Sequence, residues 1–143
     1  MNDHHYMAID PGITSGYAFF DDNGKPTDLG DVKGVNEFLD FLDDITPSPL
    51  VIIVESYVIR RYQVRENAGS KQETLQVIGA IKRYGYRRHI PVIEQDNQKK
   101  VIGYKYLGMK PSPNHRLTHR TDALAHGQYY LQSRGIVKSR LAK

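Results

Sequence analysis

Three carboxylates stand where the chain pattern favours apolar residues. Asp10 ends the run "YMAID", Glu55 ends the run "VIIVE", and Asp122 precedes the small apolar run "ALA". An unpaired carboxylate in an apolar setting costs several kcal/mol. Sites in mixed α/β sheets collect at strand ends, so these acids could converge on a hard divalent cation, which prefers oxygen ligands. Alone, Asp10 could accept hydrogen bonds from a turn, Glu55 could form a salt bridge, and Asp122 could be a surface charge.

The elements that would position these acids begin with a three-stranded meander. Residues 6–10 and 15–21 read as strands, and the Asn-Gly turn in "DDNGK" predicts a third, antiparallel strand over 27–33. Apolar residues recur at helical spacing over 34–45, where two prolines follow. Residues 50–56 form an apolar run without alternation, which is typical of a strand covered on both faces.

The second half alternates helices and strands. A helix is expected over 69–86, starting near Ser70 with Glu73 as its capping-box partner. A strand over 90–95 and helices over 97–109 and 119–134 follow. This order predicts an α/β fold, a five-stranded mixed sheet with helices on both faces. The length of 143 residues suits a single domain, 1–143, with 134–143 as a basic C-terminal tail.

Composition narrows the function classes. The sequence has no cysteine, which removes disulfides, thiol catalysis and cysteine-type zinc sites. The longest apolar run has about five residues, far short of a membrane span, so a cytoplasmic location is expected. Residues 1–59 hold 11 acidic and 2 basic side chains, whereas 60–110 hold 4 and 12 and 111–143 hold 1 and 6. This asymmetry is expected when a polyanion such as nucleic acid binds one face, although uneven solvated helices also produce it.

Several motifs together resemble a known family. "AIDPGITSGYAFF", "VIIVESYV" and "HRTDALAHGQYYL" occur in the order and at the separations found in RuvC-type Holliday junction resolvases, which have the RNase H-like fold. The stretch "ENAGSKQETLQVIGAI" also resembles the segment behind their second motif, and the resemblance spans roughly residues 6–132. The chain is shorter than bacterial members, mainly between 95 and 118, which resembles a compact phage-type version in a bacterial or phage-infected cell.

The resemblance implies a metal-dependent endodeoxyribonuclease that resolves four-way DNA junctions in recombination and repair. Two Mg²⁺ or Mn²⁺ ions about 4 Å apart would activate water and stabilise the leaving oxygen. Asp10 would anchor both ions, with Glu55 and Asp122 holding one each. Position 119 corresponds to a fourth ligand, and His119 shares a helix face with Asp122 at i, i+3. An imidazole ligand favours Mn²⁺, whereas a capping or packing role is the alternative. His126, on the same face, is expected to support the site or pack.

The segment after Glu55 is basic with interleaved tyrosines. Basic side chains neutralise phosphates, and an aromatic side chain near a site can stack on a splayed base. The resemblance implies that one of its apolar or aromatic residues wedges into the junction, although a solvated loop with packed tyrosines is the alternative. The DNA-contact candidates of this segment are Tyr57, Val58, Arg60, Arg61, Tyr62, Arg65 and Lys71.

Lysines further along could also act on DNA. Lys99 or Lys100 occupies the place of a catalytic lysine in the resemblance, in a register that the sequence leaves open. An ammonium there would stabilise charge on the scissile phosphate. Lys105 and Lys110 are candidates for a second lysine. A basic cluster at the end of the middle helix could contact DNA arms or favour the helix C-terminus; it comprises Lys82, Arg83, Arg87 and Arg88.

A four-way junction has two-fold symmetry, so paired symmetric nicks require a homodimer with two equivalent sites. The apolar face formed by Leu75, Val77, Ile78 and Ile81 could form the dimer interface or pack on the sheet.

Alternative functions remain open. "DPGITSG" is similar to the phosphate loop of actin-like ATPases and sugar kinases, but those enzymes need a second lobe and a further glycine-rich motif. No nucleotide cofactor is therefore expected. An RNA-processing nuclease similar to the YqgF group is a second alternative. A non-catalytic nucleic-acid-binding domain is a third, which the retained acids disfavour because unneeded buried charges are costly.

Overall fold

The computed structural model describes residues 3–56, 68–109 and 118–137, with the backbone alone over 68–71. Five strands form one mixed sheet in the order β3-β2-β1-β4-β5. The strands are β1 (Tyr6–Asp10), β2 (Thr14–Phe20), β3 (Pro26–Lys33), β4 (Val51–Glu55) and β5 (Val92–Gln95). The first three form the antiparallel meander, and β4 and β5 run parallel to β1. The expected five-stranded mixed sheet is confirmed.

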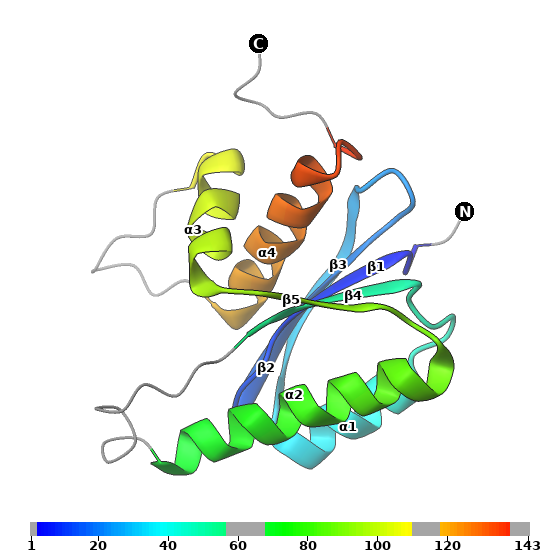
Figure 1. Cartoon of the computed structure of the whole chain (residues 1–143), viewed down its shortest axis with the longest axis vertical. Coiled ribbons are helices and arrows are strands. Elements are labelled where there is room, and N and C mark those ends of the chain that lie inside the picture. The colour runs from blue at the N-terminus through cyan, green and yellow to red at the C-terminus, as the bar shows by residue number, and fades with distance from the viewer. Residues whose placement is uncertain (1–2, 57–67, 110–117, 138–143) are drawn as a thin grey trace.

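Helices cover both faces of this sheet (Figure 1). One layer holds α1 (Val35–Asp44) and α2 (Ala68–Arg88), and the other holds α3 (Asn97–Tyr106) and α4 (His119–Ser133). Helix α2 begins at Ala68, one residue before the expected range and two residues before Ser70, so Ser70 lies inside the first turn and the predicted cap at Ser70 is wrong. The other elements match the expected order with ends shifted by a few residues.

In the middle of β1 and β2, the two faces of the sheet differ in side-chain size. Met7 and Ile9 of β1 point into a large apolar cluster beneath α1 and α2, together with residues such as Phe38. Ala8 of β1 and Ala18 of β2 point the other way, toward α4. Small side chains on this second face let α4 lie close to the sheet, so its first turn comes near the ends of β1 and β4.

The apolar face of α2 packs mainly against the sheet. Val77, Ile78 and Ile81 are buried in the cluster beneath α1 and α2, whereas Leu75 remains exposed. Core packing therefore accounts for three of the four residues considered for a dimer interface.

Candidate active site

Asp10 is the last residue of the central strand β1 and is only 6% exposed. Side chains alternate along a strand, so Asp10 points to the same face as Ala8, toward α4. The chain leaves the strand through a turn in which Ser15 Oγ contacts the backbone nitrogen of Gly12 at 3.3 Å. Asp10 therefore sits at the end of an apolar strand but faces the neighbouring helix layer.

Glu55 reaches the same place from the adjacent strand. It ends β4, which runs parallel to β1 with Ile9 opposite Val54. Ile53 faces α4, so Glu55, two residues later, faces α4 as well. The parallel register thus brings Glu55 beside Asp10.

Helix α4 supplies two further side chains. The side chain of Thr118 caps its first turn by accepting from the backbone nitrogen of Thr121, so the helix starts at His119. His119 Nδ1 lies 3.0 Å from Asp10 Oδ2. Asp122 follows one turn later, and Tyr104 of α3 donates a hydrogen bond to its Oδ1. The i, i+3 spacing therefore directs both side chains toward the strand ends, as expected.

Lys100 of α3 completes the cluster. Its Nζ lies 3.3 Å from Glu55 Oε1 and 3.6 Å from Asp122 Oδ2. Asp96 caps α3 by accepting from the backbone nitrogens of residues 98 and 99, which fixes where the helix starts. Lys99 points elsewhere, with Nζ 5.6 Å from the ring centre of Tyr129. Of the two candidate lysines, Lys100 is the one that the fold places among the carboxylates.

The carboxylates share an unusual electrostatic setting. Burial raises the pKa of Asp10 to about 7; its hydrogen bond with His119 opposes this rise, and the nearby Glu55 and Asp122 charges add to it. Burial also acts to raise the pKa of Glu55, but the nearby His126 ring, the Asp10 carboxyl and the charge of Lys100 outweigh it, and the pKa falls to about 2. Of Asp10 and Glu55, Glu55 therefore carries the negative charge more readily. A bound cation would favour loss of the proton from Asp10 as well.

The remaining charged partners respond to these carboxylates. The hydrogen bond to Asp10 raises the pKa of His119. Burial acts to lower the pKa of Lys100, but the surrounding carboxylates, Glu55 first, raise it overall. Both groups are thereby favoured in their charged form.

The donor set fits a divalent metal, although the metal geometry is not preformed. Within the described residues, no group of three or more His, Cys, Asp or Glu side chains stands in an arrangement that could hold an ion. Instead, Lys100 Nζ contacts Glu55 and Asp122. Three carboxylates, two of them close enough to perturb the third, are the oxygen donors that Mg²⁺ and Mn²⁺ take.

Three further polar side chains lie around the carboxylates. The sequence did not identify Tyr104 or Gln95 as site residues, and it left open whether His126 supports the site or packs in the core. Tyr104 follows Lys100 by one helical turn, a spacing that could have indicated a shared face. Gln95 is paired with Glu55 across β4 and β5, and a glutamine at a strand end carries no signal by itself. His126 lies one turn after Asp122, with its Nε2 atom 3.4 Å from Glu55 Oε1.

Most of the expected DNA-contact residues are not tested. Lys105 lies exposed in the last turn of α3, and for Lys71 only the backbone, inside α2, is described. The candidates outside the described residues are Tyr57, Val58, Arg60, Arg61, Tyr62, Arg65 and Lys110.

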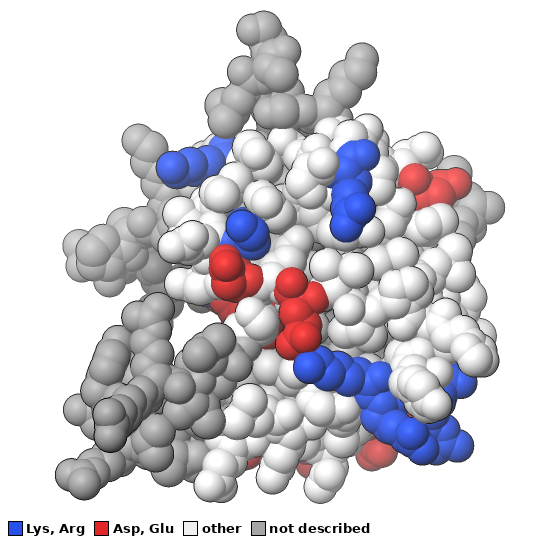
Figure 2. Space-filling model, viewed as in Figure 1, with Lys and Arg blue, Asp and Glu red and all other residues white. Residues whose placement is uncertain are grey.

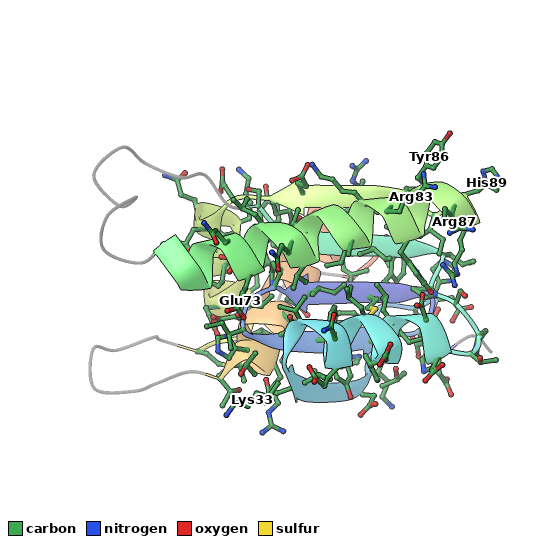
Figure 3. All side chains as sticks on the ribbon, turned by 90° about the horizontal axis from the view of Figure 1, so that it is seen from below. Lys33, Glu73, Arg83, Tyr86, Arg87 and His89 are labelled. Carbon is green, nitrogen blue, oxygen red and sulfur yellow. The ribbon has the colours of Figure 1, made fainter. Side chains whose placement is uncertain are left out.

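The basic cluster of α2 lies away from the carboxylates. Lys and Arg side chains gather over the C-terminal part of α2 in Figure 2. Figure 3 shows Arg83 and Arg87 at this end of the helix and Glu73 toward the other. Because α2 leads into the start of β5, this end lies at the N-terminal ends of the parallel strands, opposite the edge that carries Asp10. Lys82 and Arg88 of the cluster pair with Glu94 and Asp43.

The strand order, the mixed directions and the two helix layers define the RNase H-like fold. A structure of T. thermophilus RuvC in complex with a Holliday junction substrate matches with a TM-score of 0.63 and 18% identity, over 91% of this chain and 94% of that one. A second Thermus thermophilus RuvC structure matches with a TM-score of 0.60 and 19% identity, over 94% and 98% of the two chains. At this identity the similarity establishes the fold.

Comparisons at the level of sequence, in contrast, found no match. No family model matches the chain, and no curated protein matches it. Among the described residues, no helix has the length and apolar character needed to cross a membrane.

Proposed function

We propose that this chain is a divalent-metal-dependent endonuclease that cuts four-way DNA junctions, a compact phage-type relative of RuvC. The proposal rests mainly on one observation: three carboxylates, a histidine and a lysine lie close together at one edge of an RNase H-like sheet. These residues are Asp10, Glu55, Asp122, His119 and Lys100. The similar RuvC structure solved with a Holliday junction substrate supports the choice of substrate.

The residues have distinct roles in this reaction. When bound, two divalent cations would activate water and offset charge on the leaving oxygen. Asp10 would hold both ions, and Glu55, His119 and Asp122 would complete the ligand set. Lys100 keeps a positive charge beside these groups, where it can also stabilise charge on the scissile phosphate.

A homodimer is part of the proposal because a four-way junction presents two equivalent strands for cutting. Paired nicks at symmetric positions would then come from two copies of this site acting on one substrate. The whole chain, 1–143, would act as a single nuclease domain.

Cleavage of labelled substrates tests the proposal. The protein is incubated with a synthetic four-way junction, a flap, a linear duplex and a stem-loop RNA, each with Mg²⁺ or Mn²⁺. Symmetric paired nicks in the junction are expected. Cleavage of the RNA alone would instead establish an RNA-processing nuclease, and the junction function would be abandoned.

Glu55→Gln provides the matched loss of function. This variant should bind the junction but not cut it, because it removes one metal-binding charge without changing shape. Glu94→Gln is the control, since Glu94 lies on the neighbouring strand and pairs with Lys82 outside the site. Normal cutting by Glu55→Gln would contradict the proposed ligand set.

A further inference from the structure

His126 is a fully buried polar side chain one helical turn after Asp122. Its Nδ1 atom lies 3.1 Å from Gln95 Nε2. Its Nε2 atom is buried and forms no regular hydrogen bond within the described part of the chain, but Glu55 Oε1 is 3.4 Å away. Leaving a buried polar atom without a hydrogen bond is costly, so the surroundings of Nε2 require a physical explanation.

The backbone fixes the orientation of the Gln95 amide. The nitrogen that lies near the His126 ring also lies 3.1 Å from the backbone carbonyl oxygen of His126. A carbonyl oxygen only accepts hydrogen bonds, so the amide atom that faces it must be the NH₂ group and not the oxygen. Exchanging the two amide atoms would bring two acceptors together.

The amide in turn fixes the tautomer of the ring. The NH₂ group of Gln95 has two hydrogens, one for the His126 carbonyl and one for Nδ1. Nδ1 must therefore accept, and the proton of the neutral imidazole resides on Nε2. Glu55 Oε1 lies 3.4 Å from this protonated nitrogen, an electrostatic contact slightly longer than a regular hydrogen bond.

Two donors thus converge on one oxygen of Glu55. Lys100 Nζ approaches the same Oε1 at 3.3 Å. We infer that Gln95 and His126 are positioning residues: Gln95 holds His126 as its Nε2–H tautomer, and His126 with Lys100 engages Glu55 Oε1, so that Oε2 is presented to a divalent cation. The inference rests on the proposed function in taking Glu55 as a metal ligand. Groups that orient metal ligands in this way affect metal affinity strongly.

Variants of His126 separate positioning from packing. His126→Gln keeps an amide donor near the place of Nε2, whereas His126→Leu fills the space without a donor. Gln128→Leu is the control, because Gln128 is also buried in α4 but points away from Glu55, and no described contact joins the two. Binding of Mn²⁺ alone is measured by calorimetry on the full chain, and circular dichroism confirms that each variant is folded.

His126→Leu should weaken Mn²⁺ binding about 10- to 100-fold, and His126→Gln should restore most of the affinity. Gln128→Leu should bind Mn²⁺ as the wild type does. Unchanged affinity in His126→Leu would overturn the inference, as would equal losses in all three variants. Packing alone predicts no difference between the leucine and glutamine variants beyond their stability.

The tautomer is tested without metal or DNA. Long-range ¹H–¹⁵N correlation spectra of the labelled protein should show Nδ1 of His126 without a proton and the ring proton on Nε2. Gln95→Met should abolish this fixed state. A ring protonated on Nδ1, or on both nitrogens, would overturn the inference.

These readouts are independent of nuclease activity. Should the protein bind Mn²⁺ through a fixed His126 but cut no junction, the proposed function fails and the positioning pair stands. Should it cut junctions while His126→Leu binds Mn²⁺ normally, the positioning pair fails and the proposed function stands.

Discussion

The ammonium of Lys100 lies 3.3 Å from Glu55 Oε1, joining the first turn of α3 to the end of β4. The preceding residue, Lys99, is rotated away to Tyr129. This difference makes the two lysines a natural matched pair for testing the role of charge in the site.

Lys100→Ala should reduce junction cleavage about 100- to 1,000-fold, the usual effect of removing one electrostatic donor from a reacting centre. Lys99→Ala should retain activity within a few-fold. Single-turnover cleavage rates at saturating protein measure both variants. Equal losses would mean that the lysines act through general attraction of DNA.

Asp10→Asn should stabilise the metal-free protein at pH 8. The native pKa of Asp10 is raised by burial from 3.8 to about 7. Its contribution to stability is therefore complete below pH 4 and is lost as the pH rises to about 7. This shift corresponds to about 4 kcal/mol at most. The weaker contact with His119 offsets part of it, so a net gain of about 2 kcal/mol is expected.

The gain should shrink at pH 5 and vanish near pH 3.5, as measured by denaturant unfolding with chelator present. Adding Mn²⁺ should stabilise the wild type and leave Asp10→Asn unaffected. A gain in stability that did not vary with pH would show that the charge of Asp10 does not destabilise the folded protein.

His119 should favour Mn²⁺ over Mg²⁺ in catalysis, since imidazole nitrogen suits Mn²⁺ better. His119→Asp should shift the preference toward Mg²⁺. Arg120→Ala is the control, because Arg120 pairs with Asp31 on the surface. The measurement is the ratio of cleavage rates in the two metals. A wild-type ratio at or below one would count against His119 as a ligand.

Tyr104→Phe should lower cleavage about tenfold, because it removes the hydroxyl that donates to Asp122. Burial, followed by this hydrogen bond, raises the pKa of Tyr104, so the hydroxyl keeps its proton across the working pH range. The free energy of unfolding should change by about 1 kcal/mol. Tyr84→Phe, on the opposite face of the sheet, removes a comparable hydroxyl and should leave cleavage unchanged.

Gly103→Ala should destabilise the fold by about 1–3 kcal/mol. A Cβ at Gly103 would collide with the backbone of Ala125, where α3 crosses α4. Gly79 also lies inside a helix, but a Cβ there would meet nothing within 4 Å. Gly79→Ala should therefore stabilise the protein by up to about 1 kcal/mol through helix propensity. Chemical denaturation of the two variants gives the comparison, and similar signs would refute it.

Sequence patterns were sufficient where local periodicity controls the outcome. Asp10 and Glu55 could be located because each ends an apolar run, and His119 and Asp122 because three residues separate them on one helix. The mixed sheet with helices on both faces also followed from the order of the elements along the chain. These features depend on neighbours in the chain, which the sequence displays directly.

Other features depend on contacts between distant segments. The choice between Lys99 and Lys100 depends on about 100° of helix rotation, which the packing of α3 against α4 at Gly103 determines. The role of Gln95 depends on its pairing with Glu55 and on the position of the His126 carbonyl. Neither the rotation of α3 nor the contacts of Gln95 produces a periodic pattern in the sequence. The start of α2 was misplaced because Ser70 resembles a helix cap, yet the helix extends past it to Ala68.

Helix α4 approaches its neighbours closely at three glycines, two of the contacts being made with β2 and one with α3. A Cβ at Gly16 would enter the backbone of His119, one at Gly103 would enter Ala125, and one at Gly127 would enter the ring of Phe20. Backbone surfaces cannot adjust by changing rotamer, so the helix has little room to slide or roll. Directed evolution of this site should therefore find few beneficial changes at these glycines. Altered metal or substrate preference would have to arise from changes in the side chains of α4, because the position of the helix itself stays fixed.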